Sequence, residues 1–111
     1  MADENCIDSS SIPKIVDAFD GINIKLMKCG GLREAYKMIR MARERDMKVM
    51  LGCMIETSVA ITGAATLSPL VDYADLDGNI LITNDPYDGA QVEEGKLILP
   101  SSPGLGLSLK P

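Results

Sequence analysis

Charged side chains follow three apolar, strand-like segments of the sequence, and helix-like segments separate these three. The carboxyl ends of parallel strands are where α/β barrels and open α/β sheets carry their active sites. An amine and several carboxyl groups at such an edge could move a proton and bind a cation. The charged residues are Lys25 after the segment 22–24, Glu56 after 49–55, and Asp75 and Asp77 after 71–74. This spacing predicts the catalytic rim of an enzyme.

Two acidic residues, Asp3 and Glu4, add a fourth position to this series because they precede a helix-like segment. Hard divalent cations such as Mg²⁺ bind carboxylate oxygens, commonly from one or two carboxylates together with waters and substrate. Lys25 is a candidate general acid/base, since burial and cationic neighbours can lower the pKa of a lysine. The pair Asp75-x-Asp77 could bind an ammonium group. Each residue also has a structural interpretation, as a rim lysine with its amine in water or as an aspartate that closes a turn.

The composition limits the classes of protein that the chain can represent. At 111 residues it forms one domain at most, and a complete (β/α)₈ barrel needs about 250 residues. Hydrophobic residues make up 46% of the chain and aromatic ones only 4%, so the core must be aliphatic. The net charge of −5 argues against nucleic acid or an anionic membrane as a partner, since both require a basic face. The lack of histidine excludes Ser-His and Cys-His catalysis and histidine zinc sites.

The three cysteines, Cys6, Cys29 and Cys53, form no CxxC pair. An odd number of scattered thiols within an α/β pattern is typical of a reduced, cytoplasmic protein. The sequence shows neither a basic and then apolar leader pattern nor a run that could span a membrane. We therefore expect a cytoplasmic protein without a membrane partner.

Apolar periodicity predicts alternating helices and strands. The clearest helix is expected at 32–45, where apolar residues recur at spacings of three and four on one face. The segment 47–55 is nearly all apolar after Lys48, as in a strand that is buried on both faces. The full expectation is a helix at 12–19, strands at 22–26, 47–55 and 71–74, helices at 32–45 and 59–67, short strands at 80–82 and 96–99, and turns at Asp88-Gly89 and Glu94-Gly95.

Strands that alternate with helices imply right-handed βαβ crossovers and a parallel sheet. The predicted fold class is therefore α/β, either part of a barrel or a small open sheet over residues 1–78. A C-terminal extension over 79–111 is expected to fold back over the main body. Residues 1–4 have the pattern of a strand end that runs into a loop, so we expect the chain to be a piece of a longer enzyme. Exposed sheet edges invite association, which predicts a homo-oligomer.

Four segments of the chain, in this order, carry a resemblance to one superfamily. They are Met1-Ala2-Asp3-Glu4, Asn23-Ile24-Lys25-Leu26-Met27-Lys28-Cys29-Gly30-Gly31, Met54-Ile55-Glu56-Thr57 and Asp75-Leu76-Asp77-Gly78. Together they resemble the C-terminal half of the enolase superfamily, in its muconate-lactonizing subgroup and closest to dipeptide epimerases of the L-Ala-D/L-Glu type. The resemblance covers residues 1 to about 106, and the block 23–31 is its most specific part.

The resemblance implies a modified (β/α) barrel with an N-terminal capping domain, of which this chain is the C-terminal part with about strands six to eight. It implies a Mg²⁺ ion held by three carboxylates, with Asp3 as the third ligand. It also implies two lysines on opposite faces of the substrate, with Lys25 as the lysine of the sixth strand. Glu56 matches the acid of the seventh strand and, with Ile55, joins the substrate-binding residues. Lys28 is interpreted as a loop residue.

The same resemblance assigns Asp75 and Asp77 to the α-ammonium group of a dipeptide. The parent enzyme is then a Mg²⁺-dependent epimerase that removes and returns an α-proton through an enolate. Its substrate is a dipeptide or another small carboxylate. The capping domain, the second lysine and two metal ligands lie upstream of this chain, so we expect the chain alone to be inactive. The alternatives are a muconate-type cycloisomerase or a related acid-sugar or succinylbenzoate dehydratase and, from another class, a non-catalytic oligomerising α/β domain.

Overall fold

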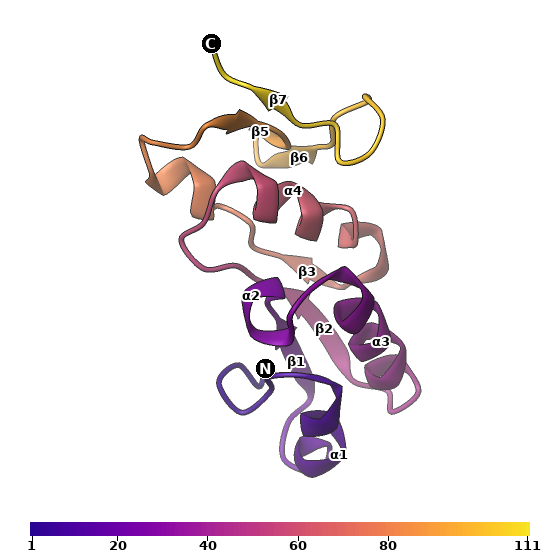
Figure 1. Cartoon of the computed structure of the whole chain (residues 1–111). Helices are drawn as coiled ribbons and strands as arrows, with labels where there is room; N and C mark the ends of the chain where they lie inside the picture. Colours follow the sequence, from indigo (N-terminus) through magenta and orange to yellow (C-terminus); the bar gives the residue numbers. More distant parts are fainter.

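The computed structural model describes all 111 residues as three parallel strands among helices, followed by short antiparallel pairs (Figure 1). None of its helices combines the length and apolar surface that crossing a membrane requires. Cytoplasmic localisation stays a prediction. With η for a 3₁₀ helix, the elements in chain order are η1 (Ser9–Ser11), α1 (Ile12–Ile15), β1 (Gly21–Ile24), α2 (Leu26–Cys29), α3 (Leu32–Arg43), β2 (Lys48–Leu51), α4 (Ser58–Ala65), η2 (Ser68–Leu70), β3 (Tyr73–Ala74), η3 (Gly78–Leu81), β4 (Tyr87–Asp88), β5 (Gln91–Glu93), β6 (Lys96–Ile98) and β7 (Ser108–Leu109).

The parallel sheet has the order β1–β2–β3, and Ala2 adds a parallel bridge to Ile22 on the outer side of β1. Ile24 lies opposite Leu51, and Leu51 lies opposite Ala74. Because all pairs are parallel, the carboxyl ends of the strands meet at one edge of the sheet. The predicted α/β class and the predicted parallel sheet are confirmed.

Helix α3 packs on β1 and β2 and lies where the sequence predicts a helix, although it ends at Arg43. Its apolar side chains face the sheet at spacings of three and four, which is the pattern of an amphipathic helix. Burial of each large aliphatic side chain stabilises the fold by about 1.5–3 kcal/mol. The buried residues of α3 are Ala35, Met38, Ile39 and Ala42.

The strand prediction for 52–55 is wrong, because β2 ends at Leu51. At Gly52 the backbone passes so close to Asn23 that an added Cβ would lie 2.6 Å from Asn23 Oδ1. The chain then leaves the sheet, and Met54 and Ile55 are 43% and 69% exposed. The apolar residues of this segment therefore continue past the end of β2 into a loop, which borders the carboxyl edge of the sheet.

Several further segments differ from the sequence prediction. The strands expected at 22–26 and 71–74 are shorter, at Gly21–Ile24 and Tyr73–Ala74. The turn expected at Asp88-Gly89 is wrong, because Asp88 lies in β4.

Two other segments change their type or length. The helix expected at 12–19 is short, since η1 is followed by α1, which ends at Ile15. The strand expected at 80–82 is wrong, because this segment begins within η3. There the Ile80 N–H donates to the carbonyl of Asp77 at 3.1 Å, and this local bond curls the backbone.

The C-terminal extension contains the antiparallel hairpin β5–β6, which confirms the strand predicted at 96–99. Its turn is formed by Glu94 and Gly95, with φ angles of 48° and 77°. Two consecutive residues with positive φ are typical of the tightest hairpin turns. The turn predicted at this dipeptide is therefore confirmed.

Two contacts attach the extension to α4, which lies between the sheet and the extension in Figure 1. The Asp85 carboxylate accepts from the Ser58 N–H at 2.7 Å, at the N-terminus of α4. The Ala90 N–H donates to Thr62 Oγ1 at 2.8 Å in the middle of the helix. Burial raises the pKa of Asp85, but the donors at Ser58 and Tyr87 and the charge of Lys110 together outweigh burial, so the pKa lies below its ordinary value.

Asp72 connects the elements at the opposite edge of the sheet, where β2 begins. Its carboxylate accepts from the Val49 N–H at 2.8 Å, from Arg43 Nη1 at 2.6 Å and from Lys48 Nζ at 3.2 Å. These donors, the Val49 amide above all, lower the pKa of Asp72 to about 2. Because the folded pKa lies below the unfolded value of 3.8, the ionised Asp72 carboxylate stabilises the fold at pH values above 3.8. This contribution is lost as the pH falls through the folded pKa.

We predict that Asp72→Asn lowers the urea midpoint of unfolding at pH 7 and removes the Asp72 part of its pH dependence between pH about 4 and 2. Urea titrations across this pH range measure both effects. Asp17→Asn, at an exposed position, is the matched control. An unchanged pH profile in Asp72→Asn would show that the three donors do not stabilise the charged form.

The free edge of β3 leads to a second prediction. β3 pairs only with β2, and Tyr73 is 56% exposed. Unpaired edge strands invite pairing with another chain, so we expect light scattering at high concentration to give a multiple of the 11.9 kDa chain mass. Tyr73→Lys should shift the protein toward monomer, whereas Tyr36→Lys on α3 should not. A monodisperse monomer of the unaltered chain would contradict this prediction.

Candidate functional site

An ion cluster of one aspartate and two lysines lies at the carboxyl edge of the sheet. Lys25 Nζ lies 3.0 Å from Asp3 Oδ2, and Lys28 Nζ lies 2.7 Å from Asp3 Oδ1. The Asn23 amide donates to Asp3 Oδ2 at 3.1 Å. The side chains of Lys25, Lys28 and Asp3 are 17%, 12% and 30% exposed, so salt screens them less than a surface pair. Asp3 and Lys25, both predicted site residues, are thus in direct contact.

Lys28 is the residue of this cluster that the sequence interpretation missed. Its ammonium donates to the carbonyl of Asp3 at 2.7 Å and to that of Asn23 at 3.0 Å, besides the Asp3 carboxylate. The interpretation as a loop residue is wrong, because α2 forms one helical turn directly after Lys25. Residues three apart on a helical turn lie on the same side. A signal for Lys28 was available in the sequence. The Lys-x-x-Lys spacing places Lys28 three residues after Lys25 and just before Gly30, which ends α2 with a φ of 91°.

The charge state of Asp3 bears on metal binding. Burial raises its pKa, but hydrogen bonds and charge from Lys28 and Lys25 outweigh burial, so the pKa lies below its ordinary value. A carboxylate ligand must be ionised in this way. However, no group of three or more potential ligand side chains exists in the chain, and each Asp3 oxygen already contacts an ammonium. Since Mg²⁺ demands near-octahedral oxygen ligands, the residues of this chain do not by themselves fit a Mg²⁺ site.

Glu56 lies in the loop between β2 and α4, in the part-buried position that follows exposed Ile55. Its Oε1 atom accepts from the Met54 N–H at 2.7 Å. Its Oε2 atom is buried and has no hydrogen-bond partner. A buried carboxylate oxygen without a partner carries a desolvation cost, so Glu56 has an acceptor free for a donor from outside this chain.

Asp75 and Asp77 are exposed on either side of buried Leu76, directly after β3. Leu76 inserts into the core and thereby holds both carboxylates at the surface. They line a hollow of about 180 Å³ together with Leu97 and other residues of the β5–β6 hairpin. This hollow is anionic and is open to a small cation.

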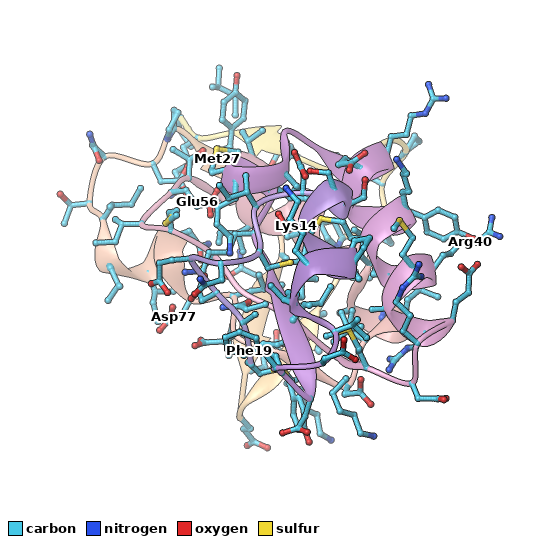
Figure 2. All side chains as sticks on the ribbon, turned by 90° about the horizontal axis from the view of Figure 1, so that it is seen from below. Lys14, Phe19, Met27, Arg40, Glu56 and Asp77 are labelled. Carbon is cyan, nitrogen blue, oxygen red and sulfur yellow. The ribbon has the colours of Figure 1, made fainter.

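The six predicted site residues form two groups rather than one continuous contact network. Asp3 and Lys25 belong to the ion cluster, while Ile55, Glu56 and the aspartate pair occupy the loops after β2 and β3. In Figure 2, Glu56 and Asp77 lie on the same side of the molecule, and Arg40 of α3 lies on the other side.

A larger hollow of about 860 Å³ lies elsewhere, along the exposed side of α3. All of its lining residues come from the single segment 30–44, and none is a predicted site residue. It is the space among long side chains of one helix, such as Arg33, Lys37 and Arg40. We therefore take the carboxyl edge, and not this hollow, as the candidate site.

A parallel sheet with lysines and carboxylates at the carboxyl ends of its strands is the arrangement of α/β enzymes, in barrels and in open sheets alike. The sequence model described as "Enolase C-terminal domain-like" matches residues 1–111. The chain belongs to this family. The resemblance inferred from the sequence motifs is confirmed.

Similar proteins are dipeptide epimerases. The L-Ala-D/L-Glu epimerase of Bacteroides thetaiotaomicron is 52% identical over 107 residues, which are 96% of this chain and 28% of that protein. A substrate-liganded L-Ala-D/L-Glu epimerase from Bacillus subtilis is 33% identical with a TM-score of 0.88, over 96% of this chain and 32% of its own. A dipeptide epimerase from Enterococcus faecalis, complexed with Mg and L-Leu-L-Tyr, is 40% identical with a TM-score of 0.86. The match covers 97% of this chain and 33% of that protein. The chain spans about a third of the length of these relatives.

The ion cluster predicts a measurable effect of Lys28. We expect Lys28→Met to raise the pKa of Asp3 toward 3.8 and to lower the free energy of unfolding by about 1.5–3 kcal/mol, the range for a hydrogen bond to a charged group. Carboxyl NMR titration and urea unfolding measure the two quantities. The control is Lys37→Met on the exposed side of α3. An unchanged pKa of Asp3 in Lys28→Met would mean that Lys25 alone sets its charge.

Proposed function

We propose that this chain is the C-terminal part of a Mg²⁺-dependent dipeptide epimerase, in which Lys25 moves the α-proton of the substrate. The contact between Lys25 and Asp3 at the ends of neighbouring strands is the observation that carries this proposal. It is supported by relatives that act as dipeptide epimerases and that match nearly the whole chain. The rest of the site would come from protein outside these 111 residues.

Lys25 is the proton-transfer residue in this proposal. Its side chain is 17% exposed, so it reaches solvent at the rim while its ammonium is oriented by Asp3. As an ammonium, Lys25 can return a proton to one face of the α-carbon, and after loss of its own proton the neutral amine can take one from that face. Inversion at the α-carbon requires a second acid/base on the other face, which we assign to protein outside this chain.

Asp3 would be one ligand of the Mg²⁺ ion in the whole enzyme. When bound, the ion would stabilise the negative charge that develops on the substrate carboxylate as the α-proton leaves. Asp3 contributes an ionised oxygen donor, with Lys28 holding its main chain and side chain. Further carboxylates from outside this chain are required, since a single carboxylate is a poor site for a strongly hydrated ion.

Asp75 and Asp77 would bind the α-ammonium group of the dipeptide. Both are exposed carboxylates held by the buried Leu76 between them. Two negative charges attract an ammonium and repel a dicarboxylate, so the pair favours a dipeptide over a muconate-like acid. Glu56 and Ile55 border the same loops and complete the proposed substrate surface.

A chimeric enzyme tests the proposed function. This chain would replace the matching segment of the Bacteroides thetaiotaomicron epimerase, with which it is 52% identical. We expect the chimera to epimerise L-Ala-D-Glu and L-Ala-L-Glu. Lys25→Ala should lower kcat by about 10²–10⁴-fold, the usual contribution of general acid/base catalysis. Asp77→Asn should mainly raise KM.

The control for the chimera is Lys14→Ala, at an exposed lysine of α1, which should leave kcat unchanged. A folded chimera without activity would contradict the proposed function. Activity that survives Lys25→Ala would contradict the role of Lys25 alone.

We predict that the 111-residue chain by itself has no epimerase activity. Catalytic groups that act as a unit lose most of their effect when one is missing, and this chain carries only the Lys25 side of the proposed acid/base pair. The measurement is deuterium incorporation from heavy water into the α-carbon of a dipeptide with Mg²⁺ present. Exchange that depends on Lys25, shown by its loss in Lys25→Ala, would overturn this prediction and indicate that copies of the chain rebuild a working site.

A further inference from the structure

The loops after β2 and β3 are joined by a thiol. Cys53 Sγ donates to Asp77 Oδ1 at 3.8 Å. The backbone amides of Asp77 and Gly78 lie close enough to this sulfur to lower the pKa of Cys53. The thiol of the β2 loop therefore contacts the carboxylate of a residue that follows β3.

The packing around this thiol is tight. A Cβ added at Gly78 would collide with the carbonyl oxygen of Met54 and would lie 3.3 Å from Cys53 Sγ. Gly78 is buried, so the turn after Asp77 can approach the β2 loop only because it carries no side chain there. A second link lies just beyond these loops, between η3 and the start of α4, where Asn79 Nδ2 donates to Ser58 Oγ at 3.0 Å. The two loops thus form one unit.

We propose that Cys53 is a positioning residue that fixes the direction of the Asp77 carboxylate toward the substrate ammonium. This inference rests on the proposed function for the role of the ammonium, while the contact itself is independent of it. Cys53 lies outside the four sequence segments that carry the family resemblance, and they give it no role. Cys53 acts through Asp77 and does not touch the reacting atoms.

The chemistry of the thiol suits this role. An exposed aspartate otherwise populates several staggered rotamers, and ordering such a side chain costs free energy on binding. A thiol is a weak hydrogen-bond donor, and Cys53 donates to the carboxylate of Asp77. Burial raises the pKa of Cys53 above its ordinary value more than the two amides lower it. The thiol therefore keeps the proton that it donates.

The test measures the side-chain rotamer of Asp77 in the full chain by NMR. With Cys53 present, we expect the two Hα–Hβ couplings of Asp77 to be unequal, one large and one small. In Cys53→Ala they should converge on intermediate values, because the carboxylate loses its donor and rotates. Cys53→Ser, which keeps both a donor and an acceptor, should restore unequal couplings. The couplings of Asp75, on the other side of Leu76, are the internal reference.

Cys29→Ala is the matched control, since Cys29 Sγ lies near the carbonyl of Gly31 and not near Asp77. If Cys53→Ala unfolds, Cys53→Val fills the same space without a hydrogen-bonding group and gives the same test. Couplings of Asp77 that stay unequal in the folded Ala or Val variant would overturn the proposal. The measurement needs no dipeptide, so a failure of the chimeric enzyme and a failure of the Cys53 proposal are separate results.

Discussion

Parallel pairing in a fixed register is the constraint on which the candidate site depends. The bridge between Ala2 and Ile22 places Asp3 beside Asn23, and their side chains meet at 3.1 Å. In the same way, the pairing of Ile24 with Leu51 and of Leu51 with Ala74 brings Lys25 and the start of the two following loops to one edge. Helices return the chain after each strand, so every strand end points the same way. A one-residue slip would turn every side chain of a strand to the other face.

Charge is divided along this edge, and the division suits a substrate with two opposite charges. Two ammonium groups share the single carboxylate of Asp3, so the ion cluster itself carries a net positive charge. The loops after β2 and β3 carry Glu56 and the aspartate pair without a compensating lysine in contact, so that side is negative. A dipeptide carries a carboxylate at one end and an ammonium at the other, which accords with the proposed function.

The sequence predicted the parts of the structure that depend on local pattern. Apolar periodicity was sufficient for α3 and for the alternation of strands with helices, and the Glu94-Gly95 dipeptide was sufficient for the hairpin turn, because each is encoded within a short segment. It was not sufficient for Lys28, whose partner Asp3 lies 25 positions away in the sequence, or for Cys53, which contacts Asp77 at a separation of 24. Contacts of that range exist only once the sheet has formed. Residues 52–55 were assigned to a strand because apolar residues that border an open edge have the same composition as buried ones.

Titration of the isotope-labelled chain with L-Ala-L-Glu would locate the dipeptide site most directly, because each residue reports its own NMR shift. The account predicts shifts confined to the carboxyl edge, at Lys25, Glu56, Asp75 and Asp77. The carboxyl shifts of the aspartate pair should disappear with the N-acetylated dipeptide, which lacks the ammonium group. Shifts centred on the opposite edge around Asp72, or on the exposed side of α3, would contradict a dipeptide site at the strand ends.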